Sequence, residues 1–258
     1  MGMVIFGARA YHHARLYENA TTELVALQGV QEQAILKLEK FATTILGTLI
    51  KDKHQANFLR VQKRRSIEMH NAQRYTRYFM SLLVVVMLSY FFVSLHIFIF
   101  FGSLAAMTTL ILGLISPVLM VTIHTHVEYL GDIVLSFESK GVIGSVVKLF
   151  NGGDMTVALV ILLFSVVIPL LKVLALLFIS IFRRNRFAHH IVKFFKMIGK
   201  WSMVDVFVVA LFLVYLSANK GDVSHAEVEI GLYFFLAYVI VSMLLSLVAE
   251  RMLWKQNT

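Results

Sequence analysis

The first part of the chain carries apolar residues at helical spacing. Between residues 22 and 50 they recur every three or four positions, which predicts an amphipathic helix. Two settings fit this helix: packing on the protein itself or on a partner, and lying flat on a membrane. The positions that form its apolar face are Leu24, Leu27, Ile35, Leu38, Phe41, Ile45 and Leu49.

The pattern then changes from basic to apolar. The stretch from Lys51 to Arg77 is rich in Lys and Arg, whereas no Asp, Glu, Lys or Arg occurs between Arg77 and Glu128. A membrane span needs about 20 apolar residues, so this stretch holds enough for two helices, 80–100 and 104–123, divided near residue 102. Further apolar runs predict helices over 156–182, 201–217 and 230–249.

Composition supports a membrane setting for these runs. Hydrophobic residues make up 59% of the chain and charged residues only 15%, against roughly 25% charged residues in soluble domains. The mean hydropathy is +0.77. The net charge of +9 favours basic cytoplasmic loops over nucleic-acid binding, because the basic residues cluster beside apolar runs. We therefore predict an all-α integral membrane protein, a four-helix bundle with an extra N-terminal hydrophobic helix.

The loops predict how the helices are oriented. The segment after 156–182 is rich in Lys and Arg and should be cytoplasmic. The loop before 156–182 and the loop after 201–217 then lie outside, and the tail 251–258 lies inside. The helix 80–100 breaks this scheme, because crossing would put the basic stretch 51–78 outside. Either that helix is re-entrant or lies against the bundle without crossing, or it crosses and the charge rule fails.

Two loop segments alternate like strands. Residues 121–128 and 223–230 each place apolar and polar side chains on opposite faces, so they could pair into a small sheet in the periplasmic loops. One face of the first segment carries His124, His126 and Glu128, which are possible metal ligands. An exposed polar strand face is the favoured interpretation, and we expect no metal and no cofactor.

One acidic side chain lies inside an apolar run. Asp205 follows Trp201 by about 6 Å of helix rise, and Trp favours the membrane interface. Asp205 is therefore expected about one turn into the hydrocarbon layer. An ionised carboxylate at that depth costs a few kcal/mol unless it is paired or hydrated.

A basic side chain in another run offers a partner. Lys172 is the only charged residue of the span 156–182 and shares a helix face with Ser165 and Pro169. Pro169 has no N–H and frees the carbonyl of Ser165. Antiparallel helices could bring Lys172 near Asp205, either as an ion pair that pins two helices or as part of a polar network along a hydrated path. Both interpretations stay open.

Small and hydroxyl residues mark two packing faces. Thr109, Gly113 and Ser116-Pro117 lie along one side of the span 104–123, and Ser242 and Ser246 are one turn apart in the span 230–249. We expect packing roles for both faces. The chain has no nucleophile elbow, phosphate loop or metalloprotease motif, so we do not expect an enzyme.

The residues around Asp205 resemble a known family. Residues 201–207 read WSMVDVF and resemble the WSMxDVF signature of the paraquat-inducible protein A family of bacterial inner-membrane proteins. Three other segments resemble the family in the same order: ISPVLM from Ile115, SVVIPLLK from Ser165 and GLYFF from Gly231. The resemblance covers roughly 104–250, one four-span unit. Many relatives have two units and Cys-rich zinc ribbons, and the absence of cysteine excludes such a ribbon here.

This resemblance implies a function and a set of residues. Family members work beside periplasmic MCE lipid-transfer proteins and are thought to move phospholipids between the inner and outer membranes of Gram-negative bacteria. The family's motif positions fall on Pro169, Lys172, Trp201, Ser202 and Asp205. The alternatives are a proton- or ion-coupled transporter or channel built around Lys172 and Asp205, and a non-transporting envelope scaffold.

The predicted organisation has four parts. Residues 1–78 form a basic, amphipathic helical region and 79–101 an extra hydrophobic helix. Residues 102–250 form the transmembrane domain that resembles the family, and 251–258 a cytoplasmic tail. The first two parts match nothing in the family, so they leave the regulation of the protein open.

Overall fold

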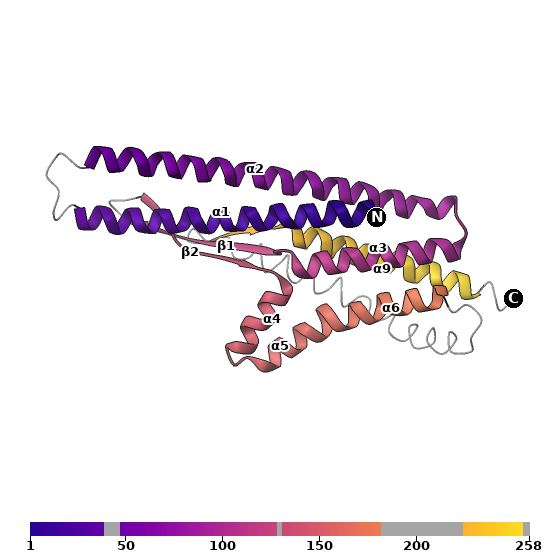
Figure 1. Ribbon diagram of the computed structural model, residues 1–258. Helices are drawn as coiled ribbons and strands as arrows, with labels where there is room; N and C mark the ends of the chain where they lie inside the picture. Colours follow the sequence, from indigo (N-terminus) through magenta and orange to yellow (C-terminus); the bar gives the residue numbers. More distant parts are fainter. Residues whose placement is uncertain (39–46, 128–130, 182–223, 255–258) are drawn as a thin grey trace.

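The computed structural model describes residues 1–38, 47–127, 131–181 and 224–254 (Figure 1). The described part is mostly helical. A long N-terminal helical hairpin lies beside a group of apolar helices, and a small sheet runs along the hairpin (Figure 1).

Two long helices form the hairpin. α1 (Gly2–Leu38) and α2 (Gly47–Leu88) lie side by side along most of α1 (Figure 1). Apart from Ala20, the buried positions on α1 are separated alternately by three and four residues, the heptad spacing of a coiled coil. These positions are Gly7, Ala10, Ala14, Tyr17, Thr21 and Leu24. The predicted single helix over 22–50 is wrong, because its two ends belong to α1 and α2, which pack against each other.

Polar contacts cross this hairpin. Nδ1 of His13 lies 2.6 Å from Oε2 of Glu68. Arg65 donates a hydrogen bond to the hydroxyl of Tyr17 at 3.0 Å, and the Tyr17 hydroxyl in turn donates to the sulfur of Met120 at 3.8 Å. Polar pairs at positions between two helices favour one register over others. They also tie the hairpin to the strand that contains Met120.

The end of α2 packs against the apolar helices. The ring centroids of Phe79 and Phe234 are 5.0 Å apart, and those of Tyr90 and Phe98 are 5.3 Å apart. A 3₁₀ turn (Ser89–Phe91) follows α2 and leads into α3 (Leu95–Ile115). α2 and α3 therefore run antiparallel over these turns.

A separate helix over 80–100 is therefore wrong, and so is the division near residue 102. The chain turns at residues 89–94 instead. Gly102 lies within α3, where an added Cβ would come 2.5 Å from Cδ2 of Leu245. This glycine provides room for a neighbouring helix rather than a break in its own helix.

Three helices in the described ranges are long and apolar enough to span a membrane. They are α3, the continuous run Met155–Ile181, and α9 (Ile230–Trp254) over its first 23 residues. The run Met155–Ile181 consists of α5 (Met155–Leu162), the π-helical segment η2 (Leu163–Val167) and α6 (Ile168–Ile181). The predicted helix 201–217 lies outside the described residues, so the four-span bundle stays a prediction.

Among the described spans, α3 and α9 pack closely against each other. An added Cβ at Gly113 would lie 2.9 Å from the backbone nitrogen of Phe235. Thr109 is fully buried and donates to the carbonyl of Ala105 at 2.7 Å. The predicted packing face with Thr109 and Gly113 is thus confirmed. Small residues let the two backbones approach, which increases dispersion contact between helices in lipid.

Three strands form an antiparallel sheet. β1 (Leu119–Val127) lies between β2 (Gly131–Lys140) and β3 (Ser224–Val228). Thr122 is opposite Phe137 of β2 and His225 of β3. β1 and β3 contain most of the two segments whose alternation predicted strands, whereas β2 was not predicted. A short helix, α4 (Val142–Asn151), joins the sheet to α5.

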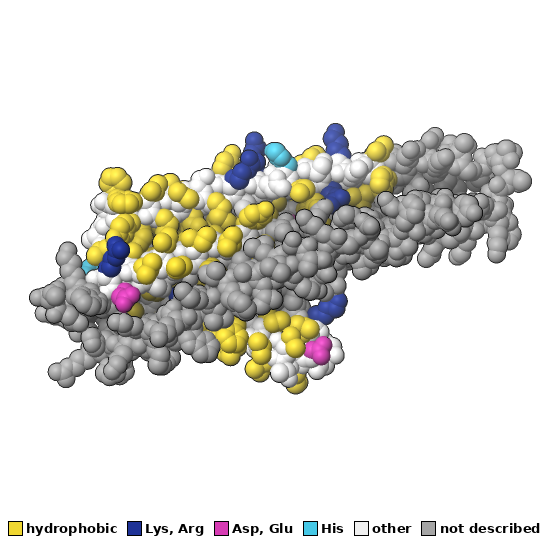
Figure 2. Space-filling view, turned by 180° about the vertical axis from the view of Figure 1, so that it is seen from behind, with side chains coloured by type: hydrophobic (Ala, Val, Ile, Leu, Met, Phe, Trp, Pro, Cys, Tyr) yellow, Lys and Arg dark blue, Asp and Glu magenta, His cyan; other side chains and the backbone are white. Residues whose placement is uncertain are grey.

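Hydrophobic side chains cover the outer surface of the apolar helices and of the end of α2. Figure 2 shows them gathered over the end of the molecule where α2 meets the apolar helices, with Lys and Arg along the edge beyond. On the run Met155–Ile181 only 22% of the most apolar window is buried within the protein. Exposed apolar surface of this extent is expected where lipid is the solvent.

Candidate functional site

The candidate site lies between α6 and α9, inside the membrane-spanning part. The side chain of Lys172 is 5% exposed, and its Nζ donates a hydrogen bond to Oγ of Ser242 at 3.2 Å. Ser242 is fully buried and donates to the carbonyl of Val239 at 3.1 Å. The backbone carbonyl of Ser242 also accepts a hydrogen bond from Ser246 at 2.7 Å. A chain of polar groups thus runs along the face of α9 that contacts Lys172.

A second contact joins the same two helices one turn away. The hydroxyl of Tyr238 donates to the carbonyl of Pro169 at 3.1 Å, and Tyr238 is fully buried. Tyr238 and Ser242 are separated by four residues on α9, as a shared helix face requires. The two contacts hold α6 and α9 in one relative position.

The helix before Pro169 is locally widened. In η2, the amide of Ile168 donates to the carbonyl of Leu163, five residues earlier. Proline lacks an N–H and its ring crowds the carbonyl four residues before it, which for Pro169 is the carbonyl of Ser165. A π-helical turn relieves that crowding, and such turns are frequent at functional sites. Ser165 lies within this turn and is buried.

Burial of Lys172 requires polar compensation. A charged side chain in a span costs several kcal/mol unless polar groups or water surround it. The Ser242 hydroxyl supplies one acceptor, and the widened turn frees backbone carbonyls on the same helix. Ser165, Pro169 and Lys172 are all buried, which agrees with their spacing on one helix face.

The sequence prediction missed the α9 side of this site. Ser242 was assigned to packing, and Tyr238 was not singled out. The spacing of Tyr238, Ser242 and Ser246 at four-residue intervals was the available signal. Trp201, Ser202 and Asp205 lie outside the described residues, so the pairing of Lys172 with Asp205 stays a prediction.

A second arrangement joins two of the family-like segments. The amide of Gly231 donates to the carbonyl of Pro117 at 2.9 Å, and the amide of Glu229 donates to the carbonyl of Val118 at 3.2 Å. An added Cβ at Gly231 would lie 2.5 Å from the Pro117 carbonyl oxygen. The end of α3 and the start of α9 are therefore bonded backbone to backbone.

The hydroxyl of Ser116 is buried in this junction without a hydrogen bond among the described residues. Glu229 nearby in the junction is also buried. The sequence predicted packing for Ser116-Pro117, and the backbone bonds agree with that role.

The strand histidines provide no described site. Glu128 lies outside the described residues, and the backbone register of β1 shifts between Ile123 and His124. No group of three His, Cys, Asp or Glu side chains suited to a metal ion occurs within the ranges that the structure describes.

Comparisons with known proteins find relatives of the part of the chain that contains this site. The family model described as "Paraquat-inducible protein A" matches residues 103–258. A "Probable intermembrane transport protein" of Haemophilus influenzae is 28% identical over 123 residues, which cover 44% of this chain and 28% of that protein. "Intermembrane transport protein PqiA" of Escherichia coli K12 is 26% identical over 133 residues, which cover 49% of this chain and 31% of that protein.

The matches also define what is particular to this chain. The aligned segment spans less than a third of the length of these curated relatives. α1, α2 and the beginning of α3 precede the segment that the family model matches. No solved structure matches the chain. Because the family model covers more than half of the residues, including the buried Lys172 and the junction at Gly231, this multi-pass membrane protein belongs to the paraquat-inducible protein A family.

Proposed function

We propose that this protein is an inner-membrane subunit of an MCE-type system that moves phospholipid-like lipids between the inner and outer membranes of a Gram-negative bacterium. The observation that carries the proposal is the buried Lys172, held by Ser242 inside the family-matched spans. Relatives of this segment are named intermembrane transport proteins. An ionisable group inside a span is a functional-site hypothesis by default.

The proposed role for the α6–α9 contact is to handle a polar headgroup or its counter-charge. A Lys ammonium has three donors and suits a phosphate. The Ser242 hydroxyl contacts the Lys172 ammonium, and the widened turn at Ser165 lies earlier on the same helical run. Asp205 is proposed as a second charged group of this site.

The proposed partner is a periplasmic MCE lipid-transfer protein. We place the sheet and α4 on the periplasmic side, because the basic segment after Ile181 favours the cytoplasm. α6 ends at the other pole from the sheet, where the hydroxyl of Ser180 donates to the carbonyl of His96 at the start of α3. Lipid would pass between the spans and the partner on the sheet's side.

Purification with mass spectrometry tests this proposal. The full chain is tagged, extracted in gentle detergent from its own bacterium, and analysed for bound proteins and lipids together. We expect an MCE-domain protein and phospholipid to copurify. Lys172→Met should lower the bound lipid while the partner is retained. Lys63→Met, which removes the same charge from an exposed site on α2, is the matched control.

A second candidate function also has a specific observation in its favour. Lys172 is buried, and ionisable groups inside spans mark proton and ion pathways. Under this alternative, the protein in liposomes would carry a proton or ion flux that Lys172→Met abolishes and Lys63→Met preserves. A preparation with neither flux, lipid nor MCE partner would instead favour a non-transporting envelope scaffold.

A further inference from the structure

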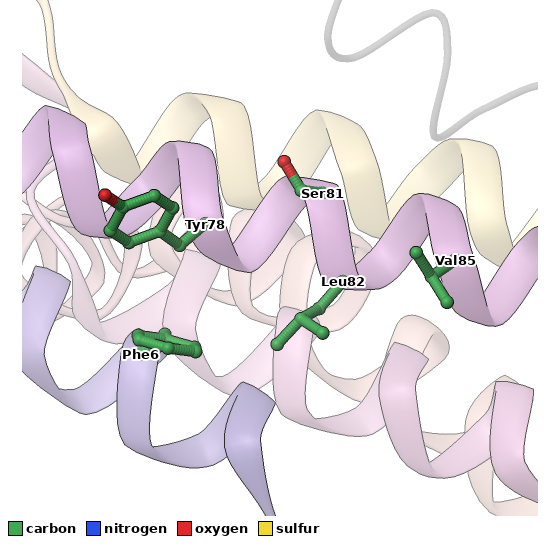
Figure 3. A pocket seen from close by; sticks show the side chains of 5 residues that line it. All are labelled: Phe6, Tyr78, Ser81, Leu82 and Val85. Atoms are coloured by element: carbon green, nitrogen blue, oxygen red, sulfur yellow. The ribbon is translucent and has the colours of Figure 1, made fainter.

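A groove lies between the beginning of α1 and the apolar end of α2. It has a volume of about 310 Å³. Phe6 of α1 lies across from Tyr78 and Leu82 of α2, and Ser81 and Val85 complete the lining (Figure 3). Most of this lining is apolar. The groove is narrow, apolar and open along one side, so it can hold one acyl chain against the two helices but does not enclose a whole lipid.

The groove opens where lipid is expected. The opposite face of the same α2 turns packs onto the spans through Phe79 and Leu83. Val85 and its neighbour Val84 are exposed on the outer side, as is Ile5 of α1. The groove therefore lies at the level of the apolar layer and faces away from the helix bundle.

An aromatic and basic rim adjoins one end of the groove. The ring of Phe6 is 5.7 Å from that of Tyr78 and 6.4 Å from that of Tyr75. The guanidinium carbon of Arg9 lies 5.6 Å from the centre of the Tyr75 ring. Tyrosine is favoured at the membrane–water interface, which is where the apolar part of α2 begins.

Two further arginines belong to this rim. Arg74 is one turn before Tyr78 on the same face of α2, and Arg77 is three residues after Arg74. Both are exposed, and neither they nor Arg9 form a salt bridge with a carboxylate in the described ranges. Three unneutralised guanidinium groups therefore adjoin an apolar groove, which is complementary to a phosphate joined to an acyl chain.

From this arrangement we infer that the α1–α2 groove binds an anionic glycerophospholipid. One acyl chain occupies the groove, and the headgroup phosphate lies at Arg9, Arg74 and Arg77. The inference deepens the proposed lipid transport, since it adds a lipid site on the N-terminal hairpin, outside the family-matched residues. The site would hold lipid of the leaflet on the sheet's side.

Photo-crosslinking in nanodiscs tests the site. The full chain is reconstituted in phosphatidylcholine with a small fraction of diazirine-acyl phosphatidylglycerol or, separately, diazirine-acyl phosphatidylcholine, and labelled peptides are mapped by mass spectrometry. We expect phosphatidylglycerol to label residues 78–85 preferentially, and excess unlabelled phosphatidylglycerol to compete. Leu159 of α5, whose side chain is 64% exposed, reports ordinary lipid contact and should show no preference.

Charge variants separate the site from general attraction. Each Arg→Gln change among Arg9, Arg74 and Arg77 should reduce the headgroup preference about fivefold, the effect of one basic charge near an anionic surface. The matched triple variant R60Q/K63Q/R64Q loses the same charge farther along α2 and should keep the preference. Equal labelling by the two lipids, or an equal loss of preference in R60Q/K63Q/R64Q and in the rim variant R9Q/R74Q/R77Q, would overturn the inference.

A groove-filling variant tests the acyl chain directly. Ser81→Trp adds a large ring at the edge of the groove and leaves the arginines in place, so it should strongly reduce labelling at 78–85. Retained labelling would contradict the acyl-chain position. Oxidation of Ser81→Cys, in a chain without other cysteines, detects a second copy: a covalent dimer would assign the groove to protein instead. None of these readouts requires transport, so lipid can bind here even if the proposed transport function fails.

Discussion

Lys172 and Ser242 are 70 residues apart in the chain, yet the Lys172 ammonium donates to the Ser242 hydroxyl across the α6–α9 contact. Both side chains are buried. The contact gives a charged group inside a membrane span a polar partner on a different helix. The contact therefore couples the position of α9 to the position of the Lys172 ammonium.

This contact should appear as an energetic coupling between the two residues. A double-mutant cycle of Lys172→Met and Ser242→Ala should give an interaction energy of about 0.5–3 kcal/mol in detergent unfolding, as for other groups in direct contact. Ser246→Ala, which removes a hydroxyl one turn away, should combine with Lys172→Met almost additively. Additive behaviour of the Ser242 cycle would mean that the bond contributes nothing measurable.

The Tyr238 hydroxyl should contribute separately. Tyr238→Phe removes the donor to the Pro169 carbonyl and leaves that buried carbonyl without the bond, which costs about 1–3 kcal/mol. We expect a lower melting temperature for the variant in the same detergent. Tyr233→Phe, at an exposed position of the same helix, is the control and should leave the melting temperature unchanged. Equal melting temperatures for both variants would remove Tyr238 from the account of the α6–α9 contact.

Part of this site could be predicted from the sequence because its residues break a strong pattern. Lys172 and Pro169 stand out in an apolar run, and their helical spacing gives the shared face. Ser242 does not stand out, because a serine in a span packs as readily as it accepts a bond from another helix. Which helix faces which is a tertiary property that periodicity along one segment does not contain.

The prediction of the helix boundaries in the N-terminal part was wrong for a related physical reason. The loss of charge after Arg77 correctly marked where the chain becomes apolar, but it contains no information on where a helix ends. α2 continues through that change without interruption, because a helix satisfies its backbone in water and in lipid alike. The turn instead comes at residues 89–94, and Gly102 serves the contact with Leu245.

The junction between α3 and α9 should depend on the missing side chain of Gly231. A Cβ there would lie 2.5 Å from the Pro117 carbonyl oxygen and 2.7 Å from that of Ser116. Backbone atoms cannot move aside as a flexible side chain can, so Gly231→Ala should destabilise the protein by about 1–3 kcal/mol or more.

A second glycine provides the control for this effect. An added Cβ at Gly144 of α4 meets nothing within 4 Å, and alanine is favoured over glycine within helices by about 0.5–1 kcal/mol. Gly144→Ala should therefore be neutral or stabilising in the same thermal unfolding assay. Similar losses for Gly144→Ala and Gly231→Ala would show that close backbone contact is not the cause.

The course of α2 along α3 predicts on which side of the membrane the hairpin lies. Phe79 contacts Phe234 near the start of α9, while Tyr90 contacts Phe98 near the start of α3. These two contacts lie toward opposite ends of α3, because α9 begins beside Pro117, just beyond the end of α3. If α3 spans the membrane, the basic part of α2 before Phe79 emerges on the side of the sheet, against the positive-inside rule.

Single-cysteine labelling in intact cells tests this topology, because the chain has no other cysteine. A membrane-impermeant maleimide should label Lys63→Cys of α2 and Asp154→Cys, which precedes α5 at its sheet-side end, under the same conditions. Arg251→Cys, near the end of α9, should be labelled only after the cells are permeabilised. All three positions are exposed in the structure.

If Lys63→Cys is instead labelled only after permeabilisation, as Arg251→Cys is, then α2 does not follow α3 across the membrane. The basic stretch is then cytoplasmic, as the charge rule alone predicts. Labelling of Lys63→Cys with Asp154→Cys would mean that packing against α3 outweighs the charge rule in this hairpin.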